Sequence, residues 1–185
     1  IWADPKPDGS EPNNWESIFN GSTWEFDEST KQYYFHLFSK KQPDLNWENP
    51  DVRQAVFEMM NWWFEKGIDG FRVDAITHIK KNFEAGDLPV PDGKKFAPAF
   101  DVDMNQPGIQ EWLQEMKDKS LSRYDIMTVG EANGVTPNDA EEWVGEENGK
   151  FNMIFQFEHL GLWSTGDTKF DVKSYKQVLN RWQKQ

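Results

Sequence analysis

Three short runs in the sequence are mostly apolar, and each follows a segment whose apolar residues have helical spacing. These runs cover 68–75, 126–129 and 153–157. Strands that are apolar on both faces are typical of parallel sheets, because helices cover such sheets. Alternation of helices with such strands therefore predicts an α/β fold, either a barrel or a doubly wound sheet.

The helices expected around these strands cover about 50–66, 109–116, 136–143 and 171–183. Asn49 can cap the first of them, Pro50 suits its first turn, and Gly67 follows its end. Helical spacing predicts one apolar face on each helix. The expected faces are Val52, Val56, Met59, Met60 and Trp63; Ile109, Trp112, Leu113 and Met116; and Val172, Tyr175, Val178, Leu179 and Trp182.

The first 48 residues lack this alternation. Pro5, Pro7, Gly9, Pro12 and Gly21 interrupt them, and only 33–38 is predicted as a strand. We expect this part to be an elaborated loop or a small subdomain. The chain has 185 residues, fewer than the roughly 250 of a complete (β/α)8 barrel.

Composition argues against several classes of protein. The net charge is −12 and the Lys and Arg residues are scattered, so nucleic acid and anionic membranes are not expected as partners. No apolar run approaches 18 residues, and the absence of cysteine excludes disulfides and thiolate metal sites. The lack of cysteine allows an intracellular origin and equally allows a secreted protein; of the two we expect a cytoplasmic protein. The start at Ile1, without a charged and apolar leader, is interpreted as an internal position.

Two carboxylates stand at the ends of neighbouring predicted strands. Asp74 ends the first apolar run and Glu131 follows the second, 131 − 74 = 57 positions later. This separation fits one strand–helix unit, and active sites of α/β folds lie at the carboxyl ends of the strands. A pair of carboxylates in one cleft is the minimum requirement of a glycosidase.

The sequence around each carboxylate suggests its role. Arg72 precedes Asp74 by two residues and is expected on the same face of the strand, where it favours the ionised form that a nucleophile requires. A buried ion pair is the structural alternative. Glu131 has no cation near it in the sequence, so we expect an apolar setting that favours the protonated form of an acid.

Longer motifs resemble one family. GFRVD at 70–74, followed by VGEA at 129–132, resembles the α-amylase family of glycoside hydrolases (family 13). HLFSKKQPDLNWENPDVR, GIDGFRVDAITHI and FQFEHL resemble its oligo-1,6-glucosidase and α-glucosidase branch. The resemblance implies a (β/α)8 TIM barrel with a small domain inserted after the third strand. Residues 1–48 would end the inserted domain, and residues 49–185 would form the middle of the barrel, about strands four to six with their helices.

The resemblance also implies roles for single residues. Asp74 would be the nucleophile, Arg72 its partner, and Glu131 the general acid/base. The substrate-binding residues would be Arg72, Phe38, Gln42, Ala75 and His159, and no metal ligand or cofactor is expected. A third carboxylate and sugar-binding histidines of the family have no counterpart in this sequence, so we expect an internal part of an enzyme.

The expected activity is retaining hydrolysis of terminal α-linked glucose from oligosaccharides or disaccharides. The small residue Ala75 after the nucleophile favours α-1,4 linkages over α-1,6 linkages. Oligo-1,6-glucosidase, trehalose-6-phosphate hydrolase and sucrose isomerase or transglucosylase activities remain open. A non-catalytic scaffold homologue is the alternative of another class, and the catalytic acids of this chain argue against it.

Overall fold

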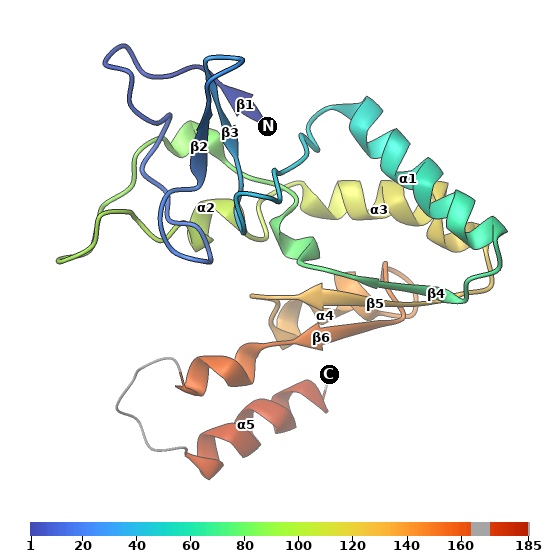
Figure 1. Ribbon diagram of the computed structural model, residues 1–185. Helices are drawn as coiled ribbons and strands as arrows, with labels where there is room; N and C mark the ends of the chain where they lie inside the picture. Colours follow the sequence, from blue (N-terminus) through green and yellow to red (C-terminus); the bar gives the residue numbers. More distant parts are fainter. Residues whose placement is uncertain (164–170, 185) are drawn as a thin grey trace. The chain divides into compact units, whose positions relative to one another are not determined.

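The chain divides into two compact units. The computed structural model describes residues 1–163 and 171–184 (Figure 1). The first unit comprises Ile1–Val52 and Lys81–Asp103, and the second comprises Arg53–Lys80 and Met104–Gln185. The assignment of residues 1–48 to the end of an inserted domain stays a prediction.

A three-stranded antiparallel sheet forms the first unit together with loops. Its strands are β1 (Trp2–Ala3), β2 (Trp24–Asp27) and β3 (Gln32–Phe35), in the order β1-β3-β2. The sequence predicted a single strand here, which was wrong. With two residues, β1 is too short for a period-2 pattern, whereas β2 reads WEFD, a four-residue alternation that the sequence reasoning overlooked.

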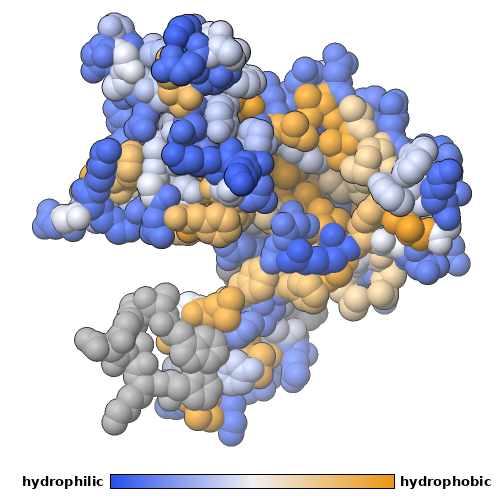
Figure 2. Space-filling view, viewed as in Figure 1, coloured by the Kyte–Doolittle hydropathy of each residue, from blue (hydrophilic) through white to orange (hydrophobic). Residues whose placement is uncertain are grey.

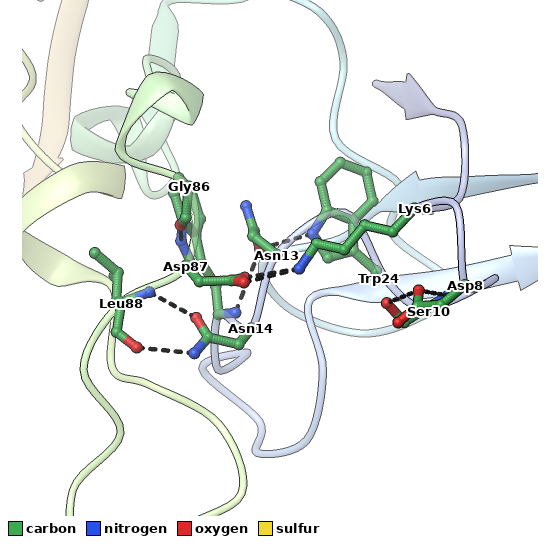
Figure 3. Close-up of polar contacts among 10 residues, drawn as sticks. Lys6, Asp8, Ser10, Asn13, Asn14, Trp24, Gly86, Asp87 and Leu88 are labelled. Carbon is green, nitrogen blue, oxygen red and sulfur yellow. Dashed lines mark hydrogen bonds and ion pairs between the residues drawn. The ribbon is translucent and has the colours of Figure 1, made fainter.

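Aromatic side chains and an asparagine hold the later segment of the first unit to the earlier one. The Asn14 side chain donates to the Leu88 carbonyl and accepts from the Leu88 amide, both at 2.8 Å (Figure 3). Trp15 stacks on Phe83 with ring centroids 5.3 Å apart, and its indole donates to the Gly86 carbonyl. Residues 81–103 therefore fold with the first 52 residues. The core consists of Trp15, Trp24, Phe35, Leu37 and Ala99.

The second unit contains a parallel sheet, as predicted. Strands β4 (Gly70–Val73), β5 (Met127–Ala132) and β6 (Met153–Gln156) pair in the order β4-β5-β6. The register places Val73 opposite Gly130 and Glu131 opposite Phe155. This register fixes which side chains share a face of the sheet.

One face of this sheet is covered and the other is open. The covered face includes the buried residues Thr128 and Ala132, and Phe71 lies 5.0 Å from the buried ring of Phe64 on a helix. Hydrophobic residues on the open face stay exposed, and exposed hydrophobic side chains of the molecule appear orange in Figure 2. The exposed apolar residues of this face are Met127, Met153 and Phe155. The sequence predicted that both faces of this sheet are covered. Among the described residues, only one face is covered.

The predicted helices are present, and a short helix that the sequence did not predict, α2, lies between the first two of them. The α-helices of the described residues are α1 (Pro50–Glu65), α2 (Phe100–Asp103), α3 (Ile109–Lys119), α4 (Ala140–Val144) and α5 (Val172–Trp182). The predicted face of α3 is confirmed, since all four of its residues are buried. On α5 only Val178 is fully buried and Val172 is half exposed. None of the helices within 1–163 and 171–184 has the length and apolarity needed to cross a membrane.

The predicted face of α1 is wrong. The helix buries Phe57, Met60 and Phe64, whereas Met59 and Trp63 are 48% and 43% exposed. Almost every side of this helix carries apolar residues, so the spacing alone allows two faces. Contacts of Phe64 with Phe71 and Tyr124 select the buried one.

Candidate active site

Asp74 and Glu131 stand at the same level of the parallel sheet. Asp74 directly follows Val73, the last residue of β4, and Glu131 directly follows Gly130, the residue paired with Val73. Since side chains alternate along a strand, Asp74 and Glu131 share the open face with Arg72. The Asp74 side chain is 71% exposed and the Glu131 side chain 22% exposed.

The guanidinium of Arg72 bridges the two carboxylates. Its Nη1 lies 2.7 Å from Oδ1 of Asp74, and its Nη2 donates to Oε1 of Glu131 at 2.8 Å. The structure thus brings together three of the predicted site residues. A planar group with parallel donors holds two acceptors in a fixed relation, which a lysine ammonium cannot do.

The prediction of an apolar setting for Glu131 is wrong. In addition to Arg72, Glu131 accepts a hydrogen bond from the backbone N–H of Ala75, with 2.9 Å from N to Oε2. Sequence neighbours of Glu131 gave no sign of either donor, because both come from the adjacent strand. The register would have revealed Arg72, since its ladder partner Val129 lies on the same face as Glu131.

Ala75 turns the chain away from β4. Its backbone has φ 44° and ψ 33°, the left-handed conformation, and its carbonyl accepts from the His78 amide at 3.0 Å. The short 3-10 helix Ile76–His78 that follows is buried. The structure therefore places Ala75 in the site through its backbone, a contact that sequence reasoning missed.

Phe38 and Gln42 belong to the first unit. Phe38 packs against the core of that unit, and its ring lies 5.8 Å from the Phe19 ring. The Gln42 side-chain oxygen accepts from the Ser39 amide. Nearby Asp44 pairs with Lys81 at 2.6 Å and accepts from the Leu37 amide. Their role in binding a substrate stays a prediction.

His159 follows β6 in the 3-10 helix Glu158–Trp163. Its Nδ1 lies 3.2 Å from the amide nitrogen of Gln156, and its ring meets the Tyr175 ring edge at 6.1 Å. The preceding Glu158 pairs with Arg181 and accepts from the Trp182 indole at 2.9 Å. Glu158 thus joins this turn to α5. A role of His159 in binding sugar stays a prediction.

No cluster of three or more His, Asp or Glu side chains suited to a metal ion occurs in the described part, 1–163 and 171–184. Two carboxylates with one shared cation can supply a nucleophile and a proton donor within one small volume.

Comparison with protein families gives a match over the entire chain. Residues 1–185 match the family described as the alpha amylase catalytic domain. A curated relative, the probable oligo-1,6-glucosidase 3 of Bacillus subtilis (strain 168), is 58% identical over 184 residues. The match covers 99% of this chain and 33% of the relative. The chain therefore spans about a third of that relative's length.

Solved structures give the same result. The trehalose-6-phosphate hydrolase of Bacillus licheniformis matches with a TM-score of 0.86 and 42% identity, over 99% of this chain and 33% of that one. An isomaltulose synthase from Protaminobacter rubrum matches with a TM-score of 0.86 and 34% identity, over 100% of this chain and 33% of that one. The backbone described above is thus similar to one third of each of these enzymes.

Proposed function

Because the chain belongs to the α-amylase family of catalytic domains, we propose that it forms part of the barrel of a retaining α-glucosidase. Asp74 is the nucleophile and Glu131 the general acid/base of this proposal. The observation that carries it is the bridge of Arg72 between the two carboxylates at adjacent strand ends. A non-catalytic scaffold would have no need for this arrangement.

In the first step Asp74 attacks the anomeric carbon of the terminal glucose. Protonated Glu131 gives its proton to the glycosidic oxygen, the bond from the anomeric carbon to that oxygen breaks, and a glycosyl ester of Asp74 forms. Arg72 orients Asp74 for attack, because its Nη1 lies 2.7 Å from Oδ1 of that carboxylate. Retaining enzymes need carboxyl groups about 5 to 5.5 Å apart, and a shared guanidinium favours such closeness.

In the second step Glu131 acts as a base. It takes a proton from water, whose oxygen attacks the anomeric carbon and releases Asp74. Two inversions give a product with the configuration of the substrate. Arg72 and the Ala75 N–H orient the Glu131 carboxyl group for this step.

Two linkage types have support. The small side chain of Ala75 beside the nucleophile favours α-1,4 substrates such as maltose, as the sequence suggested. The name of the curated relative at 58% identity, an oligo-1,6-glucosidase, favours α-1,6 substrates such as isomaltose. The two structural relatives are named trehalose-6-phosphate hydrolase and isomaltulose synthase, so activities of these two kinds also stay open. A cytoplasmic location belongs to the same proposal, and the lack of cysteine agrees with it.

The test uses the full-length protein with maltose, isomaltose, sucrose and trehalose 6-phosphate, and with p-nitrophenyl α-glucoside. NMR of the first product should show α-glucose. Asp74→Asn should abolish turnover without loss of folding, since it removes the attacking charge and little volume. Glu131→Gln should reduce turnover by about 10²- to 10⁴-fold, the usual contribution of a general acid/base.

Asp69→Asn is the matched control. Asp69 is an exposed residue that precedes β4 at the end of the strand opposite Asp74, so its amide variant should keep wild-type turnover. Near-normal turnover of Asp74→Asn, or formation of β-glucose as the first product, would contradict the proposed roles.

A further inference from the structure

We propose that Ala75 is a positioning residue whose backbone N–H orients the acid/base Glu131. This inference rests on the proposed function and assigns a role to the residue after the nucleophile that does not depend on its side chain. The N–H of Ala75 reaches Oε2 of Glu131 at 2.9 Å, while Arg72 reaches Oε1 at 2.8 Å. The two donors act on different oxygens, so together they fix the position and the rotation of the carboxyl group.

Ala75 itself has left-handed backbone. In an ordinary strand the N–H groups donate to neighbouring strands, whereas the Ala75 N–H, in the turn after β4, donates to a side chain, and φ 44° and ψ 33° direct the chain away from β4 beyond this contact. Left-handed backbone is strained for a non-glycine residue. Such strain persists where the surrounding structure enforces it.

The buried turn after Ala75 supplies that enforcement. Ile76, Thr77 and His78 are 2%, 0% and 5% exposed, and the His78 amide donates to the Ala75 carbonyl. The peptide group after Ala75 is thereby held, and the buried turn limits movement of Ala75. The N–H before it is thus a preorganised donor, and such donors need no reorganisation during the reaction.

Both steps of the proposed reaction use this donor. A carboxylate offers about four lone-pair sites, two on each oxygen. Arg72 occupies one site on Oε1 of Glu131 and the Ala75 N–H one site on Oε2. Each oxygen therefore retains a site for the transferred proton. With the Ala75 bond lost, the carboxyl group would rotate about the remaining contact with Arg72. Proton delivery to the leaving oxygen, and proton removal from water, would both become slower.

A single-atom change tests this role. Replacement of Ala75 by L-lactic acid in the full-length protein converts the N–H into an ester oxygen and leaves the methyl side chain unchanged. We expect kcat/KM for maltose, or for whichever disaccharide is the substrate, to fall about 10- to 100-fold, because the variant lacks the hydrogen bond that positions Glu131 and stabilises the charge developing on it as its proton leaves. For 2,4-dinitrophenyl α-glucoside kcat/KM should fall less than about 3-fold, since this leaving group requires little protonation.

The second step gives an independent readout. Hydrolysis of the glycosyl ester of Asp74 requires Glu131 as a base, so kcat for the dinitrophenyl substrate should fall with the lactic acid variant. Azide attacks without a base and should restore kcat. A loss of general structure would lower all rates together and would not respond to azide.

Two controls isolate the N–H group. Ala75→Gly keeps the N–H and accepts left-handed backbone, so the rates on both substrates should change in parallel. Replacement of Ala85 by lactic acid removes a 3.3 Å turn hydrogen bond to the Asn82 carbonyl, in the other compact unit, and should leave kcat unchanged.

The outcomes separate this inference from the proposed function. A wild-type protein without α-glucosidase activity would overturn the proposed function. Wild-type activity, combined with equal losses or no loss on the two substrates in the lactic acid variant, would overturn the role of Ala75 alone.

Discussion

Gly70, the first residue of β4, has no room for a side chain. Its φ is +148°, and a Cβ added there would lie 1.6 Å from the Met127 carbonyl oxygen and 2.7 Å from its carbonyl carbon. The obstacle is the backbone of β5, which cannot rotate away. Gly70→Ala should therefore displace β4, the strand that carries Arg72 and ends at Asp74.

The expected magnitude follows from a comparison with Gly67. A Cβ at Gly67 meets no atom within 4 Å, although φ is +89°. Gly67→Ala should thus cost only the left-handed backbone, roughly 1 to 2 kcal/mol. Gly70→Ala carries a similar backbone cost and adds overpacking of typically 1 to 3 kcal/mol. Because fixed backbone is the obstacle, we expect about 3 kcal/mol or more in total.

Urea unfolding of the two full-length variants, followed by tryptophan fluorescence, measures this difference. Activity gives a second reading, because only Gly70→Ala should misplace Arg72 and Asp74 and lower kcat/KM by more than about 100-fold. Failure of Gly70→Ala to fold while Gly67→Ala folds would agree with the reasoning. Unfolding free energies within about 1 kcal/mol of each other would refute it.

Three further predictions concern charge, geometry and completeness. Hydrogen bonds from Lys119 and then from Arg53 hold the pKa of Glu115 below its ordinary value. Ionised Glu115 therefore stabilises the folded protein fully above the pKa that Glu115 has in the unfolded chain. This stabilisation is lost as the pH falls through the lower pKa of the folded state. Glu115→Gln should lose about 1 kcal/mol at pH 7 and little at pH 3, as urea unfolding at both values would reveal, whereas equal losses would contradict this. Arg72→Lys should lower kcat/KM by about 100-fold or more without altering the melting temperature, since an ammonium lacks the fork that bridges two acids; wild-type kinetics would contradict the bridge. Residues 1–185 made alone should show neither a cooperative melt nor release of p-nitrophenol from its α-glucoside. The reason is that β4 and β6 each pair with only one strand among the described residues, which leaves two open strand edges. A cooperative melt with turnover would disprove this.

Strong periodicity made some of the fold predictable. The face of α3 was identified because its polar residues leave one apolar stripe, and the parallel strands were identified from their continuous apolar runs. The family resemblance and the partial (β/α)8 barrel are confirmed as well. Helix α1 failed the same reasoning, since apolar residues surround it and only the packing of Phe64 selects a face. Strands as short as β1 have no period to detect.

The candidate site divides in a similar way. Spacing placed Asp74 and Glu131 at neighbouring strand ends, and alternation placed Arg72 beside Asp74. The contacts of Glu131 with Arg72 and with the Ala75 N–H could not be obtained from sequence neighbours. They depend on the register of β4 against β5 and on one left-handed residue, which spacing along the chain does not determine.

The shared guanidinium of Arg72 couples the two halves of the proposed catalytic cycle to one residue. A substitution that weakened its hold on Asp74 would also loosen Glu131, so formation and breakdown of the glycosyl ester could not be adjusted separately there. A change of acceptor from water to another molecule would therefore require substitutions at residues that contact only the acceptor.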